Sequence, residues 1–533
     1  MEIKRTQMRL LGLTLGAAVV LGGCSGGGGG GGTAAGTGSP APATPAGSAK
    51  PTAAAVDTKS YAIKVYNAGF ALDRPHIPRE QDPIRQMIEK KLNIDFDLTI
   101  VAQDAFNKLN VMIAGGSTPD LIWSNRAEAV KLYQQGVVAT LDEALNQTPK
   151  LKALYDDKWW QGMKFEGKTI GIPSYDDISG INGWWIRNDW LKKLNLKVPT
   201  TPDELLQVLR AFTNDDPDGN GKKDTYGILV GANRGMDQLS LMFGVNPSFH
   251  DVNPPYVSLD NGKLVYDNAD PRMKDALGYL NTIVKENLID PDWVTLVDDA
   301  KFKERIFKGK VGFTLNDWRL MEPNYTKQMQ DIGGSVPEWV VIPSMKGPRG
   351  DQALEVQKFQ KNMWVISKEA AKDPGKLKRI MEMLEYFYTD KEIYPYLAYG
   401  VKDVHWKEEG GKIATTDAFL DPNNFWIRHY AFVRKGDDPL YFNIRNPKTN
   451  DYQAINRKYI KENPVFPYLS QDPADTLYTD RIKYVQEMNI KFITGKEPLG
   501  KWDDYVKTLE SKFKLGDLME TYRKQLVQAG ILK

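Results

Sequence analysis

Strands and helices alternate through the first part of the chain that has a globular composition. Residues 61–66 and 120–123 have the content of short strands, and residues 94–100 alternate apolar and polar side chains, which is typical of a strand. Between them, residues 83–92 and 105–114 have the apolar spacing of helices. This order of strand, helix, strand, helix and strand predicts a parallel sheet in an α/β fold.

Ligands of parallel sheets bind beyond the carboxyl ends of the strands. This rule places residues 67–70 and 123–125 near a cleft, with Asn67 and Trp123 among them. A second set of strands and helices begins after GIPSYDDISG, with a strand around residues 184–187. The chain thus contains two sets of α/β elements.

The length of the chain requires more than one hydrophobic core. Without its leader and tether the chain keeps about 470 residues, which exceeds a single core and predicts two lobes. We expect residues 60–172 and about 360–395 in the first lobe. Residues about 173–359 and 396–533 are expected in the second.

The N-terminus predicts export and lipid attachment. Residues 1–23 have a basic start and an apolar run too short to span a bilayer comfortably, which indicates a secretory signal peptide. The stretch LGGC, ending at Cys24, resembles a bacterial lipobox, in which the cysteine is acylated. No other cysteine is available for a disulfide, and residues 24–59 have the composition of a flexible tether. We expect a lipid-anchored protein on the extracellular face of the cell membrane.

The charge of the chain gives no reason to expect nucleic acid as a partner. Cleavage after residue 23 removes Lys4, Arg5 and Arg9 together with Glu2, so the net charge of +2 falls to about zero. No second apolar segment of about 20 residues follows, so we expect no membrane span in the mature chain.

The stretch DPDGNGKKDTYG, residues 216–227, has the ligand spacing of a calcium loop. Its twelfth position is Gly227, which has no side chain to offer, and the following YGILV is typical of a strand, so a sensor EF-hand is not expected. A plain turn rich in Asp, Asn and Gly is the alternative. We favour one structural calcium ion. The expected ligands are Asp216, Asp218, Asn220, the carbonyl of Lys222, and Asp224.

Catalytic motifs are scarce. The sequence contains no GxSxG and no HExxH, and its four histidines are scattered. A pair of carboxylates acting as a glycosidase has no fixed spacing, so a glycan-degrading enzyme stays open as an alternative.

Aromatic residues are the stronger signal, with 13 Trp, 24 Tyr and 19 Phe in the chain. Most aromatic side chains belong to hydrophobic cores, but those at strand ends can stack on the apolar faces of sugars. Two arginines beside such tryptophans can bond hydroxyls or a carboxylate, or instead form ion pairs at the surface or between the lobes. The candidate ligand-binding residues are Trp123, Trp184, Trp185, Trp318, Arg187, Arg319, Tyr175 and Asp177.

Several stretches distributed along the chain together resemble one known family. They are STPDLIWSN, GKTIGIPSYDD, WWIRNDWLKKLNLKVPTTPDELLQVLRAF, DPDGNGKKDTYG, FKGKVGFTLNDW, MWVISKEA with YFYTDKE after its helix, GVKDVHWKEEGGKI and KFITGKEPLGKWDDYV. The chain is similar to family 1 of the extracellular solute-binding proteins, which serve bacterial ABC sugar importers. Within it, the chain resembles the large lipoproteins of Gram-positive, Paenibacillus-like bacteria, from the lipobox to the C-terminus.

The resemblance implies a type II periplasmic-binding-protein-like fold. Two α/β lobes, with parallel-dominated sheets flanked by helices, would close on a ligand in the cleft between them. Trp318 matches a position that stacks on sugar in maltose-type relatives. Trp123, Trp185, Trp364 and Trp426 match by position only.

The resemblance also bears on the calcium loop. In relatives that bind acidic oligosaccharides, a similar loop carries a structural calcium ion. Those relatives often have Glu directly after the last Asp, where this chain has Thr225. The loss of one carboxylate implies weaker calcium binding, with water in its place.

The function expected from the sequence is therefore capture and delivery. We expect a monomeric, non-catalytic lipoprotein that captures an oligosaccharide between two lobes and delivers it to the permease subunits of an ABC importer. A peptide-binding lipoprotein is a further alternative. Acidic and neutral sugars are equally compatible with the sequence.

Overall fold

The computed structural model describes residues 59–67, 76–101, 104–174, 182–232, 234–247, 249, 256–296, 298–357, 362–433, 448–472 and 474–533. The chain divides into two units, Met1–Asp57 and Thr58–Lys533, and every described residue lies in the second. Cys24, the predicted signal peptide and nearly all of the predicted tether therefore lie outside the described residues. Within the described part, no helix is both long and apolar enough to cross a bilayer.

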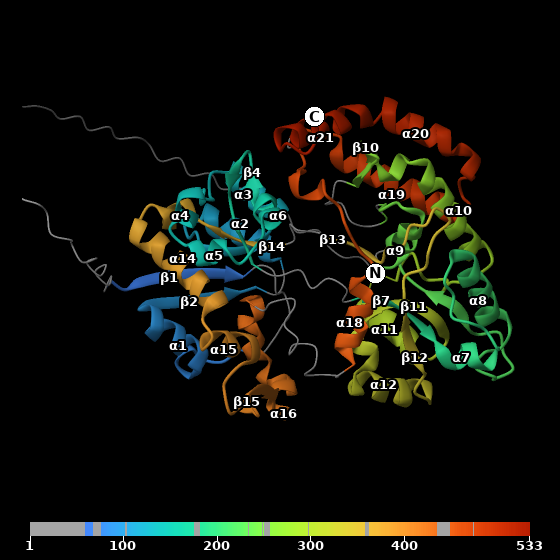
Figure 1. Ribbon diagram of the computed structural model, residues 1–533, viewed down its shortest axis with the longest axis horizontal. Coiled ribbons are helices and arrows are strands. Elements are labelled where there is room, and N and C mark those ends of the chain that lie inside the picture. Colours follow the sequence, from blue (N-terminus) through green and yellow to red (C-terminus); the bar gives the residue numbers. More distant parts are fainter. Residues whose placement is uncertain are drawn as a thin grey trace, which may run out of the picture. The chain divides into compact units, whose positions relative to one another are not determined.

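The first sheet has the strand order β2-β1-β3-β14-β6. Figure 1 labels three of its strands, β1, β2 and β14. β1 runs parallel to β2 and β3, as the alternation of elements predicts, whereas β14 lies antiparallel to β3 and β6. Its strands are β1 (Tyr61–Asn67), β2 (Ile94–Ile100), β3 (Leu121–Asn125), β6 (Ile172–Pro173) and β14 (Asn362–Ile366).

The helices around the first sheet begin and end where local sequence signals predict. α1 (Pro83–Leu92) starts after Asp82, whose carboxylate accepts hydrogen bonds from the N–H groups of Ile84 and Arg85, and it ends at Asn93 in the left-handed conformation. The other elements of this part are η1 (Arg79–Gln81), α2 (Ala105–Ala114), α3 (Arg126–Gln134), α4 (Asp142–Asn146), α5 (Pro149–Lys152), α6 (Asp157–Gly162), β4 (Lys164–Phe165), β5 (Lys168–Thr169), α13 (Lys368–Ala371), α14 (Pro374–Thr389), α15 (Ile393–Tyr399), β15 (Trp406–Glu409), β16 (Lys412–Thr415), α16 (Asp417–Leu420) and η5 (Pro422–Val433).

The second sheet has the strand order β12-β7-β11-β8. β11 is buried along its whole length; it runs parallel to β8 and antiparallel to β7, which in turn is antiparallel to β12. The strands are β7 (Asn182–Arg187), β8 (Tyr226–Leu229), β11 (Val311–Asp317) and β12 (Trp339–Ile342).

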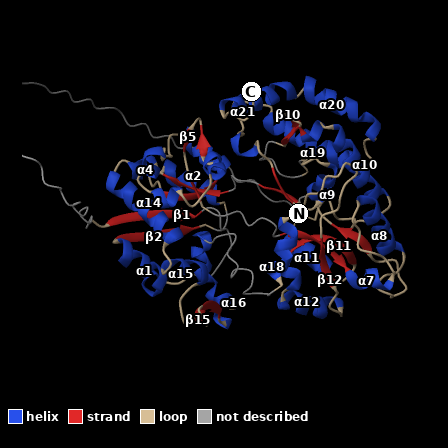
Figure 2. Ribbon diagram, in the orientation of Figure 1, coloured by secondary structure: helices blue, strands red, loops and turns tan. Residues whose placement is uncertain are grey.

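Helices also accompany the second sheet (Figure 2). α8 (Pro202–Asn214) packs on β8 and β11, and it comes so close that a Cβ at Gly312 would lie 2.1 Å from the ring of Phe212. The remaining elements are α7 (Asn188–Lys193), α9 (Met236–Ser240), η2 (Leu241–Phe243), β9 (Val257–Asp260), β10 (Lys263–Tyr266), η3 (Asp267–Ala269), α10 (Pro271–Lys285), α11 (Asp299–Phe307), η4 (Trp318–Met321), α12 (Pro323–Gly333), β13 (Glu355–Gln357), α18 (Thr449–Arg457), β17 (Ile460–Glu462), η6 (Phe466–Tyr468), α19 (Tyr478–Thr494), η7 (Leu499–Lys501), α20 (Trp502–Ser511) and α21 (Leu515–Gln528).

Hydrophobic contacts divide the C-terminal part differently from the predicted boundary at residue 396. Leu397, Trp406 and Tyr430 belong to the core cluster of the first sheet, and α15 contacts both α1 and α14. The hydrophobic clusters of the second sheet include the chain again from Tyr452 onward. Residues 396–430 were expected in the second lobe, but the buried apolar side chains of this segment belong to the core cluster of the first sheet.

Candidate functional site

The carboxyl end of β11 brings an aromatic and a cationic side chain together. Asp317 ends the strand, and its carboxylate accepts hydrogen bonds from the backbone N–H of Arg319 at 2.9 Å and from its Nε at 2.7 Å. Burial disfavours the charged form of Arg319, but the carboxylate of Asp317 outweighs burial and raises the pKa of the guanidinium. Trp318 lies between these two residues in sequence and is 5% exposed.

An aromatic pair lies beside this strand end. The rings of Trp185 on β7 and Tyr452 on α18 stack with centroids 5.1 Å apart. The indole Nε1 of Trp185 and the hydroxyl of Tyr452 both donate to the carbonyl oxygen of Asn316, each at 3.0 Å. Sequence reasoning missed Tyr452, because its place opposite Trp185 depends on a helix far along the chain.

Two amide groups near this pair keep unused donors. Asn316 is 6% exposed, and its Oδ1 accepts from the N–H of Asp317 at 2.9 Å. Its Nδ2 finds no acceptor within the described part of the chain, and the same holds for Nε2 of the buried Gln453 on α18. Since buried donors normally have partners, the Nδ2 group of Asn316 is an exception among the described residues.

Trp184 and Arg187 do not join this group. Trp184 is fully buried and stacks on Phe313 in the hydrophobic core. Arg187 forms an ion pair with Asp189 at 2.7 Å and lies over the ring of Trp190; the pair is local and its arginine is buried, so it is neither a surface nor a lobe-lobe ion pair. Because β7 and β11 are antiparallel, Arg187 at the end of β7 and Arg319 after the end of β11 lie at opposite ends of the strands.

Predicted residues of the first sheet share one face. Asn67 is in register with Trp123, and Trp123 is in register with Trp364 on β14, so the three side chains lie in a row across adjacent strands. Asn67 and Trp364 are fully buried, and Trp123 is 3% exposed. A polar chain supports them: Trp123 Nε1 donates to Ser174 Oγ, and Trp364 Nε1 donates to the hydroxyl of Tyr388 at 3.2 Å.

Of three other predicted residues, the structure describes only Trp426. Tyr175 and Asp177 fall outside the described residues. Trp426 lies in η5, 8% exposed, in the core cluster of the first sheet, with the ring of His405 5.8 Å away. It therefore belongs to neither strand edge described above.

The loop at residues 216–224 has the backbone of a wrapped turn. The N–H groups of Gly219 and Asn220 donate to Asp216 Oδ1, and the N–H of Gly221 donates to Asp216 Oδ2, each at 3.0 Å. The hydrogen bond from Gly221 lowers the pKa of Asp216. Gly221 has φ = 74°, the left-handed conformation that the sixth position of such a loop requires.

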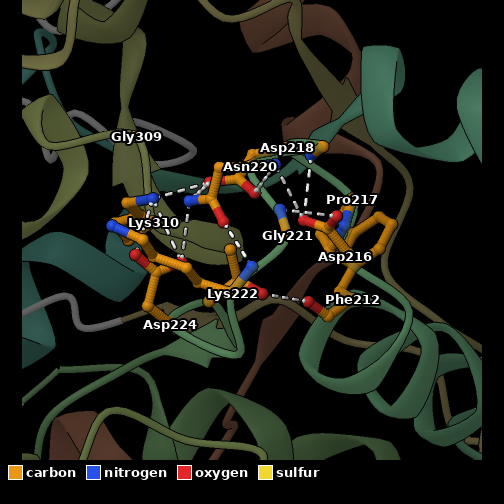
Figure 3. Close-up of polar contacts among 12 residues, drawn as sticks. Phe212, Asp216, Pro217, Asp218, Asn220, Gly221, Lys222, Asp224, Gly309 and Lys310 are labelled. Carbon is orange, nitrogen blue, oxygen red and sulfur yellow. Dashed lines mark hydrogen bonds and ion pairs between the residues drawn. The ribbon is translucent and has the colours of Figure 1, made fainter.

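The carboxylates of this loop converge on an ammonium group (Figure 3). Lys310 Nζ lies 2.6 Å from Asp218 Oδ2 and 3.1 Å from Asp224 Oδ1. The hydrogen bond from Lys310 lowers the pKa of Asp224. Among the described residues, no three acidic, histidine or cysteine side chains form a ready metal site. The two aspartates nevertheless have the donor chemistry that suits calcium, with Asn220 beside them.

The end of the loop explains two departures from the EF-hand pattern. Thr225 is 3% exposed and its hydroxyl donates to the carbonyl of Phe212 at 2.8 Å, so it faces the core. A Cβ at Gly227 would lie 2.6 Å from the carbonyl oxygen of Leu209, so a side chain at the twelfth position has no room. β8 follows, as predicted, and Tyr226 pairs with Val311 at the amino end of β11. The loop thus lies near the amino end of β11, whereas Trp318 follows the carboxyl end of the same strand.

Comparisons with known proteins identify relatives of this chain. The family model of the bacterial extracellular solute-binding proteins matches residues 78–393, more than half of the chain. Lipoprotein LipO of Bacillus subtilis is 28% identical over 71% of this chain and 73% of its own length. The polygalacturonan/rhamnogalacturonan-binding protein YtcQ of the same organism is 24% identical over 82% of this chain and 86% of its own length.

Solved structures share the fold. The alginate-binding protein AlgQ2, solved without calcium ion, matches with a TM-score of 0.65 and 20% identity over 88% of this chain and 98% of its own. An EF-hand mutant of the S. pneumoniae ABC-transporter substrate-binding protein FusA, solved with fructo-nystose, matches with a TM-score of 0.64 and 19% identity over 89% of this chain and 99% of its own. These matches confirm the expected α/β class and the type II periplasmic-binding fold. The family model, which covers more than half of the chain, shows that the chain belongs to the bacterial extracellular solute-binding protein family.

Proposed function

We propose that this chain is the substrate-binding lipoprotein of an ABC importer and that it captures an oligosaccharide. Proteins of its family bind solutes and are not enzymes, so the glycan-degrading alternative is set aside. The names of two matched proteins support a sugar ligand, since YtcQ binds polygalacturonan and rhamnogalacturonan and FusA was solved with fructo-nystose.

The observation that carries the proposal is the carboxyl end of β11. Trp318, 5% exposed in a hydrophobic cluster with Trp185, is the aromatic ring of the proposed site. Arg319 adds a guanidinium held by Asp317, and Asn316 has a buried amide donor that no described residue uses. An aromatic face next to orienting polar groups is the usual composition of a sugar site. Asn67 and Trp123 at the strand ends of the first sheet are the proposed contacts from the other lobe.

Two of the sequence candidates are assigned to other roles. Trp184 and Arg187 support the fold of the second lobe, because each is buried with a partner away from the proposed site. Lipid attachment at Cys24 and location on the outer face of the membrane complete the proposal, supported by the signal sequence and by the name of the relative LipO.

We also propose that the loop at residues 216–224 binds one structural calcium ion. The carboxylates of Asp216, Asp218 and Asp224 and the left-handed Gly221 support this reading. The loop lies at the amino end of β11, so its expected role is in stability and not in ligand contact.

A thermal-shift screen followed by calorimetry tests the main proposal. The panel contains oligogalacturonates, fructo-oligosaccharides and mixed peptides. A ligand at a hundred times its Kd stabilises the native protein by about 2.7 kcal/mol, so one sugar class should raise Tm clearly. The oligosaccharide proposal would be overturned if only peptides raised Tm, or if calorimetry detected no binding of any glycan in the panel.

A further inference from the structure

The ammonium group of Lys310 lies between two carboxylates of the 216–224 loop. Its Nζ contacts two carboxylates, Asp218 Oδ2 at 2.6 Å and Asp224 Oδ2 at 3.0 Å (Figure 3). Lys310 comes from outside the loop, from the residue before β11. One ammonium group therefore joins the first and last parts of the loop from a separate element.

The amide of Asn220 is turned the same way. Its Nδ2 donates to Asp218 Oδ2 at 3.0 Å and to Asp224 Oδ1 at 3.1 Å, while its Oδ1 accepts from the N–H of Lys222 at 2.7 Å. Donor hydrogens from Lys310 and Asn220 thus face both carboxylates. A metal ligand at Asn220 would need its oxygen on that side, so the amide would have to turn over.

Space next to the loop can receive the lysine side chain. A cavity of about 320 Å³ is lined by Lys310 and Asp224 and also by two further carboxylates, Asp290 and Asp292. The main chain at Lys310 is fixed independently, since its carbonyl accepts from the N–H of Tyr226 at 2.8 Å. The side chain can therefore move while β11 keeps its start.

We propose that Lys310 is a built-in counter-ion that competes with calcium for this loop. This inference rests on the calcium site proposed above. The ammonium group keeps the carboxylates of Asp218 and Asp224 together when calcium is absent, and calcium must displace it to bind. Because opposite charges at hydrogen-bond distance attract strongly, this displacement lowers the affinity for calcium and keeps the loop ordered at low calcium concentration.

Calorimetric titration of the purified protein with CaCl2 tests the proposal. Lys310→Met should bind calcium at least about tenfold more tightly than the wild type, since no ammonium group has to leave. Lys308→Met is the matched control: Lys308 lines the same cavity, but its ion-pair partner, at 2.6 Å, is Glu304 on α11 and not a carboxylate of the loop. The control should keep the wild-type affinity.

A second variant and a second measurement guard against misfolding. Lys310→Gln keeps an amide donor for Asp218 and should change calcium affinity in the same direction. Without calcium, both Lys310 variants should melt below the wild type, and CaCl2 should raise their Tm by more than it raises the wild-type Tm. A role in folding alone would lower Tm without tightening calcium binding.

Two outcomes would overturn the inference, and only one of them would also overturn the proposed calcium site. If the wild type binds calcium and the Lys310 variants bind it no more tightly than Lys308→Met, only the counter-ion role fails. If no variant binds calcium, the calcium site fails with it. Neither result bears on oligosaccharide binding, which the sugar titrations measure separately.

Discussion

Trp185 and Tyr452 stack 5.1 Å apart and donate hydrogen bonds to one and the same acceptor, the carbonyl oxygen of Asn316. The pair fixes the position of α18 against β7 and β11. It also orients Asn316, whose unused amide donor lies at the strand end that leads to Trp318. The pair therefore supports the proposed site while being buried itself.

Two substitutions of Tyr452 should separate the contribution of its hydroxyl group from that of its ring. Tyr452→Phe keeps the stack and removes the hydroxyl donor, so we expect a loss of about 1 kcal/mol in the free energy of unfolding. Tyr452→Ala also leaves a cavity and should cost about 3 kcal/mol. Urea unfolding measures both values. Equal losses in the two variants would show that the ring contributes nothing.

Replacing Trp318 should weaken sugar binding. Trp318→Ala removes the aromatic face at the end of β11, and a stacking contact of this kind is worth enough to reduce affinity about tenfold or more. Trp339→Ala is the control, since Trp339 lies on the same sheet at the Arg187 end of the strands. Calorimetry with the best oligosaccharide of the screen gives both affinities. Equal losses in the two variants would remove Trp318 from the site.

The two arginines should respond differently to the same substitution. Arg187→Gln breaks the ion pair with Asp189 and the contact with Trp190, so we expect a loss of about 2 kcal/mol in stability with unchanged sugar affinity. Arg319→Gln should keep more of its stability, because its side chain is 40% exposed, but should weaken binding of a ligand that contacts the guanidinium. Denaturant unfolding and sugar titration of both variants check this. The opposite pattern would return Arg187 to the site.

Local patterns predicted β1, β2 and β3 of the first sheet and the helices between them, because these elements carry their own apolar spacing and caps, as Asp82 does for α1. The antiparallel β14 and the short β6 were not predicted as members of this sheet. The site was less predictable. That Arg187 and Arg319 lie at opposite ends of the strands follows from the antiparallel pairing of β7 with β11, which no local pattern reveals. Trp184 and Trp185 point to opposite faces of the sheet. Their stacking partners, Phe313 and Tyr452, come from distant segments of the chain.

Removal of calcium should destabilise the protein. A chelator such as EDTA is expected to lower Tm, and Asp218→Ala should lower it in calcium buffer by removing a carboxylate from the loop. Asp215→Ala is the control, because Asp215 is an exposed residue just before the loop. Scanning calorimetry of the wild type and both variants, with and without CaCl2, gives the six Tm values. If neither the chelator nor Asp218→Ala changes Tm, the loop is a plain turn.

Asp267 should make stability depend on pH in the direction opposite to that of most carboxylates. It is 1% exposed, accepts hydrogen bonds from Ser258 Oγ and from the N–H of Asn246, and burial raises its pKa from 3.8 to about 7. Between these two values the folded state keeps a proton that the unfolded chain has released, so the contribution of Asp267 to stability falls as pH rises through this window and is constant above it. Asp267→Asn cannot titrate, so its stability relative to the wild type should increase from about pH 4 to pH 7, by at most roughly 4 kcal/mol. Urea unfolding across this range measures the difference, with Asp260→Asn as an exposed control on the neighbouring β9. A constant difference between Asp267→Asn and the wild type across the window would contradict a raised pKa in the folded state.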